Sequence, residues 1–174
     1  MRFQINNSLI TVAIGIIVHE NSILLIKRVR GDYIGYYALP GGKIEKNEHM
    51  HSALEREIQE ETGLVCKFDK LLGVASEFLV ENNQIKRHFL LNICKVKLPE
   101  KPLEIKDKKD EGDILWISLS KIKDYKNKII ESDYKFIEIF ALNELKHNEN
   151  LAYFSCEIEK IGDKFLLKKF ENYI

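Results

Sequence analysis

The chain lacks the composition of a disulfide-stabilised protein. Only three of its 174 residues are cysteines, an odd number whose positions fit no metal-binding spacing. We therefore expect Cys66, Cys94 and Cys156 to be buried thiols of a protein in a reducing compartment.

A hydrophobic segment long enough to cross a membrane is also missing. The start, Met1–Asn7, has no apolar signal core, and the apolar run from Leu9 to Val18 is shorter than the roughly 20 residues that a spanning helix needs. We expect a cytoplasmic protein with no membrane partner. Its length suits one domain with a full core.

Net charge is the third absence. The 27 basic and 27 acidic side chains cancel, and basic residues gather only between Lys121 and Lys128, where a solvated helix edge explains them. This composition argues against a nucleic-acid polymer as partner, though not against a small nucleotide. No Ser, Cys or His arrangement typical of nucleophilic catalysis is evident, which favours direct attack by water.

Apolar runs and turn residues predict an α+β domain. The expected strands cover residues 9–18, 23–27, 65–80, 85–98 and 114–117, and the expected helices cover residues 48–62 and 132–145. Residues 29–37 contain two glycines and three tyrosines, which suggests a loop that reaches over a site.

After residue 150 the sequence returns to strand patterning. Runs at 153–159 and 165–170 flank a turn at Gly162 and Asp163. We expect a main domain over residues 1–150 and a C-terminal hairpin over 151–174 that belongs to the same domain. Three roles stay open for the hairpin: extension of the sheet (the simplest), cover for a site, or a contact in a homodimer.

The helix predicted near the middle of the chain has an unfavourable charge pattern. Glu57, Glu60 and Glu61 are spaced i, i+3 and i+4, so a helix crowds their carboxylates on one face. Each like-charged pair costs about 0.2–0.5 kcal/mol. The helix dipole also disfavours negative charge just before Gly63, a natural C′ residue. A bound cation relieves both conflicts.

A solvated, acidic surface helix is the alternative. Met50, Leu54 and Ile58 define a buried stripe at about 100° per residue, and Glu61 projects between Met50 and Leu54. A carboxylate inside an apolar stripe is costly unless it is paired or coordinated, which favours the cation. Oxygen ligands suit Mg²⁺ or Mn²⁺, and Mg²⁺ commonly binds carboxylates together with substrate phosphates.

The acidic residues belong to a longer pattern. Nine positions across 23 residues are filled by Gly42, Glu48, Arg56-Glu57-Ile58, Glu60-Glu61 and Gly63-Leu64, after the lead-in Leu39–Glu45. This pattern resembles the complete Nudix box of the Nudix hydrolases. The resemblance implies an α/β/α sandwich with a mixed sheet between helices. The strings before and at the start of the box are similar to those of mutator-type nucleoside triphosphate pyrophosphohydrolases.

The resemblance also implies a set of metal ligands. Glu57, Glu60 and Glu61 match the metal-binding glutamates of the family, and Gly41 matches a position whose backbone carbonyl often joins them. Either Glu57 or Glu60 is the expected general base. The family often supplies one further carboxylate from a later loop, and Glu111 is the expected one.

Four other box residues are expected to be structural. Arg56 is expected to orient a box glutamate as its salt-bridge partner, with a substrate contact as the alternative. Glu48 lies at the helix start, where the dipole favours negative charge, and a water-mediated metal contact is its secondary role. Gly42 opens the box, and Gly63 ends the helix.

Arg28 and Lys43 are expected near the substrate phosphates, with solvated side chains as the alternative. The resemblance implies Mg²⁺-dependent hydrolysis of the pyrophosphate linkage in a nucleoside diphosphate derivative, by direct attack of water. A nucleoside triphosphate, oxidised or not, is the expected substrate, and ADP-ribose or a nucleotide sugar is the alternative. The rival from another class is a non-catalytic Nudix-like module that senses a nucleotide, although such modules usually lose box glutamates.

Overall fold

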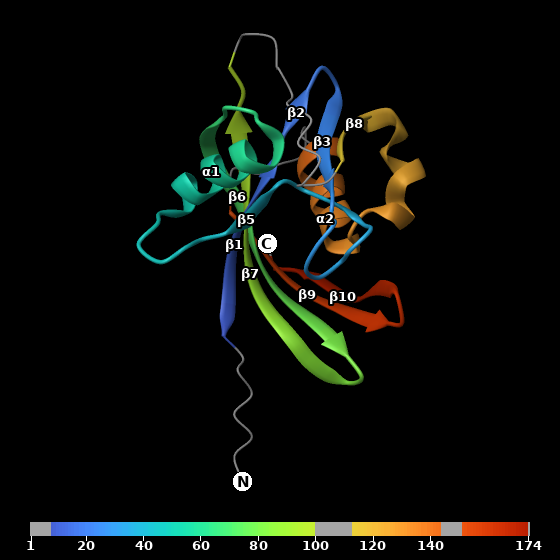
Figure 1. The fold of residues 1–174 in the computed structure, drawn as a ribbon. Helices are drawn as coiled ribbons and strands as arrows, with labels where there is room; N and C mark the ends of the chain where they lie inside the picture. Colours follow the sequence, from blue (N-terminus) through green and yellow to red (C-terminus); the bar gives the residue numbers. More distant parts are fainter. Residues whose placement is uncertain (1–7, 100–112, 144–150, 174) are drawn as a thin grey trace.

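The computed structural model describes residues 8–99, 113–143 and 151–173, and Figure 1 shows their arrangement. One sheet contains β1 (Leu9–Ile16), β5 (Gly41–Lys43), β6 (Lys67–Glu81), β7 (Gln84–Lys97), β9 (Ala152–Ile161) and β10 (Lys164–Asn172). Its strand order is β10-β9-β6-β7-β1-β5. A smaller sheet contains β2 (Val18–His19), β3 (Ser22–Lys27), β4 (Tyr37–Ala38) and β8 (Ile114–Ser118), with β3 paired to each of the others.

The described helices are of three kinds. They are the α-helices α1 (Met50–Thr62) and α2 (Glu131–Ile137), the 3₁₀ helix η1 (Leu119–Lys128) and the π-helix η2 (Glu138–Leu142). Alternating side chains of β1 place α1 and α2 on opposite faces of the larger sheet. Ala13 packs with Leu54 of α1, whereas Ile14 lies in the cluster that contains Phe136 of α2.

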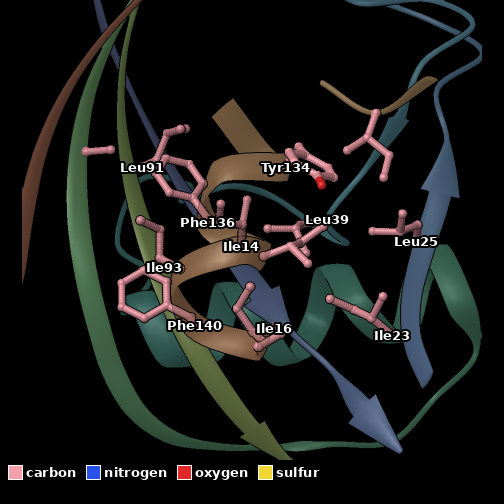
Figure 2. Packing of buried hydrophobic residues seen from close by; sticks show 14 of the residues in the cluster. Ile14, Ile16, Ile23, Leu25, Leu39, Leu91, Ile93, Tyr134, Phe136 and Phe140 are labelled. Carbon is pink, nitrogen blue, oxygen red and sulfur yellow. The ribbon is translucent and has the colours of Figure 1, made fainter. Parts of the chain in front are cut away.

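Figure 2 shows the α2 side of the core, where Ile14 and Ile16 of β1 share a cluster with Phe136 and Phe140. The sheet is mixed, because β1 is parallel to β7 whereas β6 is antiparallel to β7. The predicted α/β/α sandwich with a mixed sheet between helices is therefore confirmed.

The long hairpin of β6 and β7 also follows the prediction. Asn82 and Asn83 form its turn with φ values of 53° and 57°, a conformation that asparagine tolerates and that suits the twist of a two-residue hairpin. The register places Glu77 of β6 opposite Phe89 of β7.

The region after β8 differs from the expectation. The sequence predicts one helix over residues 132–145, whereas α2 gives way to η2, and residues 144 and 145 lie outside the described ranges. The Asn143 side chain donates a hydrogen bond to the Glu138 carbonyl at 2.7 Å, five residues back, where the chain leaves the α-helical pattern. η1 contains the basic run from Lys121 to Lys128, where a solvated helix edge is expected. Ile122 is the buried residue of η1, and the other side chains of this helix are exposed or half-buried, which agrees with that expectation.

The C-terminal hairpin adds two strands to the larger sheet. β9 runs parallel to β6, and β10 forms the outer edge. The hairpin also reaches the loop between β3 and β4, because the Phe165 ring centroid lies 4.6 Å from that of Tyr33 and 5.4 Å from that of Tyr36. Sheet extension, the simplest of its expected roles, is present.

The cysteines agree with the expectation from composition. Cys66, Cys94 and Cys156 are buried free thiols, as predicted. Within the described ranges, no helix is both long enough and apolar enough to cross a membrane.

Candidate active site

Helix α1 ends as the sequence predicts. Gly63 has a φ of 75°, and its N–H donates to the Gln59 carbonyl at 2.9 Å. Leu54 and Ile58 are fully buried. This buried stripe fixes the rotation of α1 and thereby determines which face of the helix turns toward β5.

Two consecutive glycines on β5 pack against the acidic face of α1. The Gly41 N–H donates to the Glu61 carboxylate at 2.9 Å. A Cβ atom at Gly42 would lie only 2.5 and 2.7 Å from the two carboxylate oxygens of Glu57. The absence of a side chain at Gly42 therefore provides the space that Glu57 occupies.

Arg56 links three glutamates. Its Nε and Nη2 donate to the two oxygens of Glu48 at 2.8 and 2.9 Å, and its Nη1 donates to Glu57 at 2.9 Å and to Glu60 at 3.2 Å. The Arg56 hydrogen bonds, followed by the Glu45 N–H, lower the pKa of Glu48 to about 2. The contact with Glu48 in turn raises the pKa of Arg56. The guanidinium thus orients the box glutamates and balances part of their charge.

The donor set suits a divalent cation, although its oxygens do not converge on one point. Among the described residues, no three His, Cys, Asp or Glu side chains lie close enough together to hold a metal ion. Glu57 and Glu60 nevertheless contact the same Arg56 nitrogen, and Glu61 contacts the adjacent Gly41. Their backbone positions share one helix face, so all three carboxylates lie on the same side of α1. With the space at Gly42, these residues fit Mg²⁺ or Mn²⁺.

Glu111, the expected additional ligand, lies outside the described residues, so its role stays a prediction.

A cavity of about 470 Å³ adjoins the two glycines. Basic side chains on its lining are Arg28, Arg30, Lys43 and Arg87. Arg28 and Lys43, the two residues expected near the substrate phosphates, thus line the same cavity as Gly41 and Gly42. The Arg28 Nε donates to the Asp32 carbonyl at 2.8 Å, which ties this side chain to the β3–β4 loop. This loop, predicted to reach over a site, does line the cavity.

The cavity also holds two buried carboxyl groups that the sequence did not reveal. The Tyr33 hydroxyl donates to Glu77 Oε1 at 2.9 Å, and the Leu39 N–H donates to Asp133 Oδ2 at 2.8 Å. Burial raises the pKa of Glu77 and raises that of Asp133 to about 7. Burial also raises the pKa of Tyr33 well above its usual value, with Glu77 adding to the effect. The interior of the cavity therefore favours neutral polar groups.

A sequence signal for Glu77 existed. Gly73, Ala75 and Leu79 occupy alternate inward positions of β6, and Glu77 falls on the same face. A charged residue at an inward position is the signature of a functional or specially paired group. Asp133 has a weaker signal, because it shares a helix face with apolar residues four and seven positions later.

Replacement of Asp133 by asparagine is expected to remove a pH dependence of stability. The folded pKa of about 7 exceeds the ordinary value of 3.8, so the folded state binds the proton more tightly. The stability contributed by this proton is fully present below pH 3.8 and is lost as the pH rises toward 7. At about 1.4 kcal/mol per pKa unit, the loss reaches at most roughly 4 kcal/mol.

Urea unfolding of both proteins at pH 4, 5, 6 and 7 checks this prediction. The asparagine oxygen can still accept from the Leu39 N–H, so the Asp133→Asn variant should become progressively more stable relative to the original protein as the pH rises. A difference in unfolding free energy between the two proteins that stays constant across the four pH values would contradict the prediction.

The order of elements and the geometry at β5 agree with one known family. Residues 9–140, well over half of the chain, match the family described as the NUDIX domain. The chain belongs to the Nudix hydrolase family. The predicted family is thereby confirmed, and members of this family are hydrolases that typically use a divalent metal ion.

Known proteins resemble this Nudix hydrolase to different extents. The mutator MutT protein of Bacillus halodurans shares its fold with a TM-score of 0.70 over 94% of this chain and 97% of that one, at 23% identity. An 8-oxo-dGTP diphosphatase of Proteus vulgaris is 32% identical over 92 residues, which are 52% of this chain and 82% of the relative. An ADP-ribose pyrophosphatase of Methanocaldococcus jannaschii is 53% identical over 62 residues, which are 36% of this chain and 37% of the relative. The chain thus matches little more than a third of the length of that archaeal relative.

Proposed function

We propose that this Nudix hydrolase cleaves the pyrophosphate linkage of a nucleoside triphosphate, oxidised bases included, by direct attack of water in the presence of Mg²⁺. The observation that carries the proposal is the continuity of the site. Gly41 and Gly42 contact the box glutamates and at the same time line the cavity with four basic side chains. A ligand that fills the cavity therefore presents its phosphates to the glutamates.

Different residues of the chain would bind the phosphates and the cation. Arg28 and Lys43 bind phosphate oxygens, while Glu57, Glu60 and Glu61 hold the cation together with the Gly41 carbonyl. When bound, Mg²⁺ neutralises phosphate charge and lowers the pKa of the attacking water. Phosphoryl transfer depends mainly on positioning and charge stabilisation, so no covalent nucleophile is required.

The general base is one of two glutamates. The side chain of Glu60 is 57% exposed and that of Glu57 is 19% exposed. A water molecule reaches Glu60 more readily, whereas Glu57 is enclosed between Arg56 and Gly42. We therefore assign the base to Glu60 and metal binding chiefly to Glu57.

ADP-ribose is the second candidate substrate. The match to an archaeal ADP-ribose pyrophosphatase, which is 53% identical over 62 residues, favours this substrate. The longer match to an 8-oxo-dGTP diphosphatase, which covers 82% of that relative, favours the triphosphate.

A turnover assay over a nucleotide panel separates the candidates. With Mg²⁺ the protein should convert a triphosphate into a monophosphate and pyrophosphate, whereas ADP-ribose would give AMP and ribose 5-phosphate. In ¹⁸O-labelled water, the label should appear in a phosphate of the product. Tight binding of nucleotides without turnover of any of them would instead identify a nucleotide-sensing module.

A further inference from the structure

Glu77 has a polar atom that the rest of the protein leaves unused. Its side chain lines the cavity but is only 3% exposed. Oε1 accepts a hydrogen bond from Tyr33, whereas Oε2 is buried and has no partner in the part of the chain that the structure describes. The Ser132 hydroxyl lies close enough to act on Glu77 as a hydrogen-bonding neighbour and lower its pKa, although neither Ser132 Oγ nor Glu77 Oε2 has a partner at full hydrogen-bond geometry within the same ranges. A buried polar atom without a partner costs free energy, so this arrangement calls for a ligand.

The protein holds Tyr33, and with it Oε1, in a strained position. Tyr33 has a φ of 61°, in the left-handed region that residues other than glycine rarely adopt. Its hydroxyl bonds Glu77 at 2.9 Å, and its ring packs 4.6 Å from that of Phe165 on the C-terminal hairpin. Strain of this kind persists where the surroundings enforce it, typically at ligand sites. Because Tyr33 occupies Oε1, Oε2 is the atom of Glu77 left for a ligand.

Glu77 also lies at a suitable distance from the glycines. Gly42 and Glu77 are three strand spacings apart across β5-β1-β7-β6, about 14 Å, and the register places Glu77 three residues further along the strands, about 10 Å, so the two residues are roughly 17 Å apart. A nucleoside triphosphate can bridge this span with its phosphates at the glycines and its base toward Glu77. Phe89, opposite Glu77, and Leu91 give the cavity apolar surface between the two ends.

The hydrogen-bond pattern defines the role of Oε2. Burial of the side chain favours the neutral form of the carboxyl group, and the hydroxyl of Tyr33 donates to Oε1. In that neutral form, a carboxyl group that accepts through Oε1 carries its proton on Oε2 and can donate from it.

We propose that Glu77 determines substrate specificity by donating a hydrogen bond from Oε2 to an acceptor atom, a carbonyl oxygen or ring nitrogen, on the base of the bound nucleotide. This inference rests on the proposed function, because it assumes that the cavity binds a nucleotide.

Two substitutions distinguish a donor from other roles. Glu77→Gln places an amide N–H where the acid has its O–H and keeps an oxygen for Tyr33. Glu77→Met has a similar volume but no donor. Selectivity, measured as the ratio of kcat/KM between the best and the poorest of four nucleoside triphosphates, should stay within about threefold in Glu77→Gln. In Glu77→Met it should fall on the order of 10- to 100-fold.

Binding measurements keep this proposal separate from the proposed reaction. Dissociation constants of non-hydrolysable methylene analogues of the same nucleotides, measured by calorimetry, should show the same pattern. If no nucleotide is hydrolysed but Glu77→Met still loses its binding selectivity, the proposed hydrolysis is wrong and base recognition by Glu77 is supported. If hydrolysis proceeds and Glu77→Met keeps its selectivity, base recognition by Glu77 is wrong and the proposed hydrolysis is supported.

Glu81→Gln is the matched control. Glu81 belongs to the same strand, but its carboxylate pairs with Lys160 at 3.0 Å and does not line the cavity. The selectivity of the Glu81→Gln variant should equal that of the original protein. Loss of selectivity in Glu77→Gln equal to that in Glu77→Met would overturn the proposal, because a charged acceptor would then be what the ligand recognises. Glu77→Met leaves the Tyr33 hydroxyl without its partner. Should this variant fail to fold, the double variant Tyr33→Phe/Glu77→Met, which also removes that hydroxyl, replaces it in the test.

Discussion

The Glu57→Gln variant should hydrolyse its substrate about 10²- to 10³-fold more slowly in kcat and require more Mg²⁺ for half-maximal rate. The substitution removes the charge of a carboxylate that Gly42 and Arg56 hold in place, but it keeps an oxygen that can accept from Arg56. The stability of the fold should therefore change by less than about 1 kcal/mol. Steady-state kinetics over a Mg²⁺ titration, together with thermal unfolding, measure both effects.

Glu55→Gln is the control for this prediction, because Glu55 belongs to the same helix and pairs instead with Lys67 at 2.7 Å. Its kcat and its Mg²⁺ dependence should match those of the original protein. The carboxylate-metal mechanism fails if Glu57→Gln, Glu60→Gln and Glu61→Gln all retain full turnover.

The Gly41→Ala variant should be strongly destabilised, because alanine fits neither the backbone conformation nor the space at this position. Gly41 has a φ of 141°, and an added Cβ would clash with the Ala13 carbonyl oxygen and lie 2.8 Å from the Ile14 Cα. Both atoms belong to the backbone of β1, which pairs with β5 and cannot move aside without disturbing the sheet. We expect thermal unfolding to show a loss of at least about 3 kcal/mol, or roughly 6–12 °C in Tm.

Gly42→Ala is the matched comparison, since the two glycines are adjacent on one strand. Its Cβ would meet a side chain, the Glu57 carboxylate, which can rotate away. Stability should fall by less than about 1 kcal/mol, whereas kcat should drop about as far as in Glu57→Gln. Equal losses of Tm in the two glycine variants would show that the backbone contact at Gly41 is not the cause.

The acidic face of α1 could be predicted from the sequence because its evidence is local. The spacing of Glu57, Glu60 and Glu61 on one helix and the cap at Gly63 depend only on residues within a few turns. The same holds for the longer strands, whose alternation and turn residues are local, whereas the short strands β4 and β5 were not predicted.

The interior of the cavity could not be predicted in this way, because its contacts connect distant segments. Asp133 accepts from the N–H of Leu39, 94 residues earlier, and Tyr33 donates to Glu77, 44 residues later. Arg87 joins the same cavity through β7. No local periodicity encodes such pairs. The inward position of Glu77 was a readable clue, but the partner that explains it comes from another loop.

The packing of Phe165 against Tyr33 couples the C-terminal hairpin to the cavity. Phe165 lies beyond residue 140, where the match to the family model ends, and its ring supports the β3–β4 loop that lines the cavity. A substitution in this hairpin can therefore shift Tyr33 and its contact with Glu77 without altering any glutamate of the Nudix box.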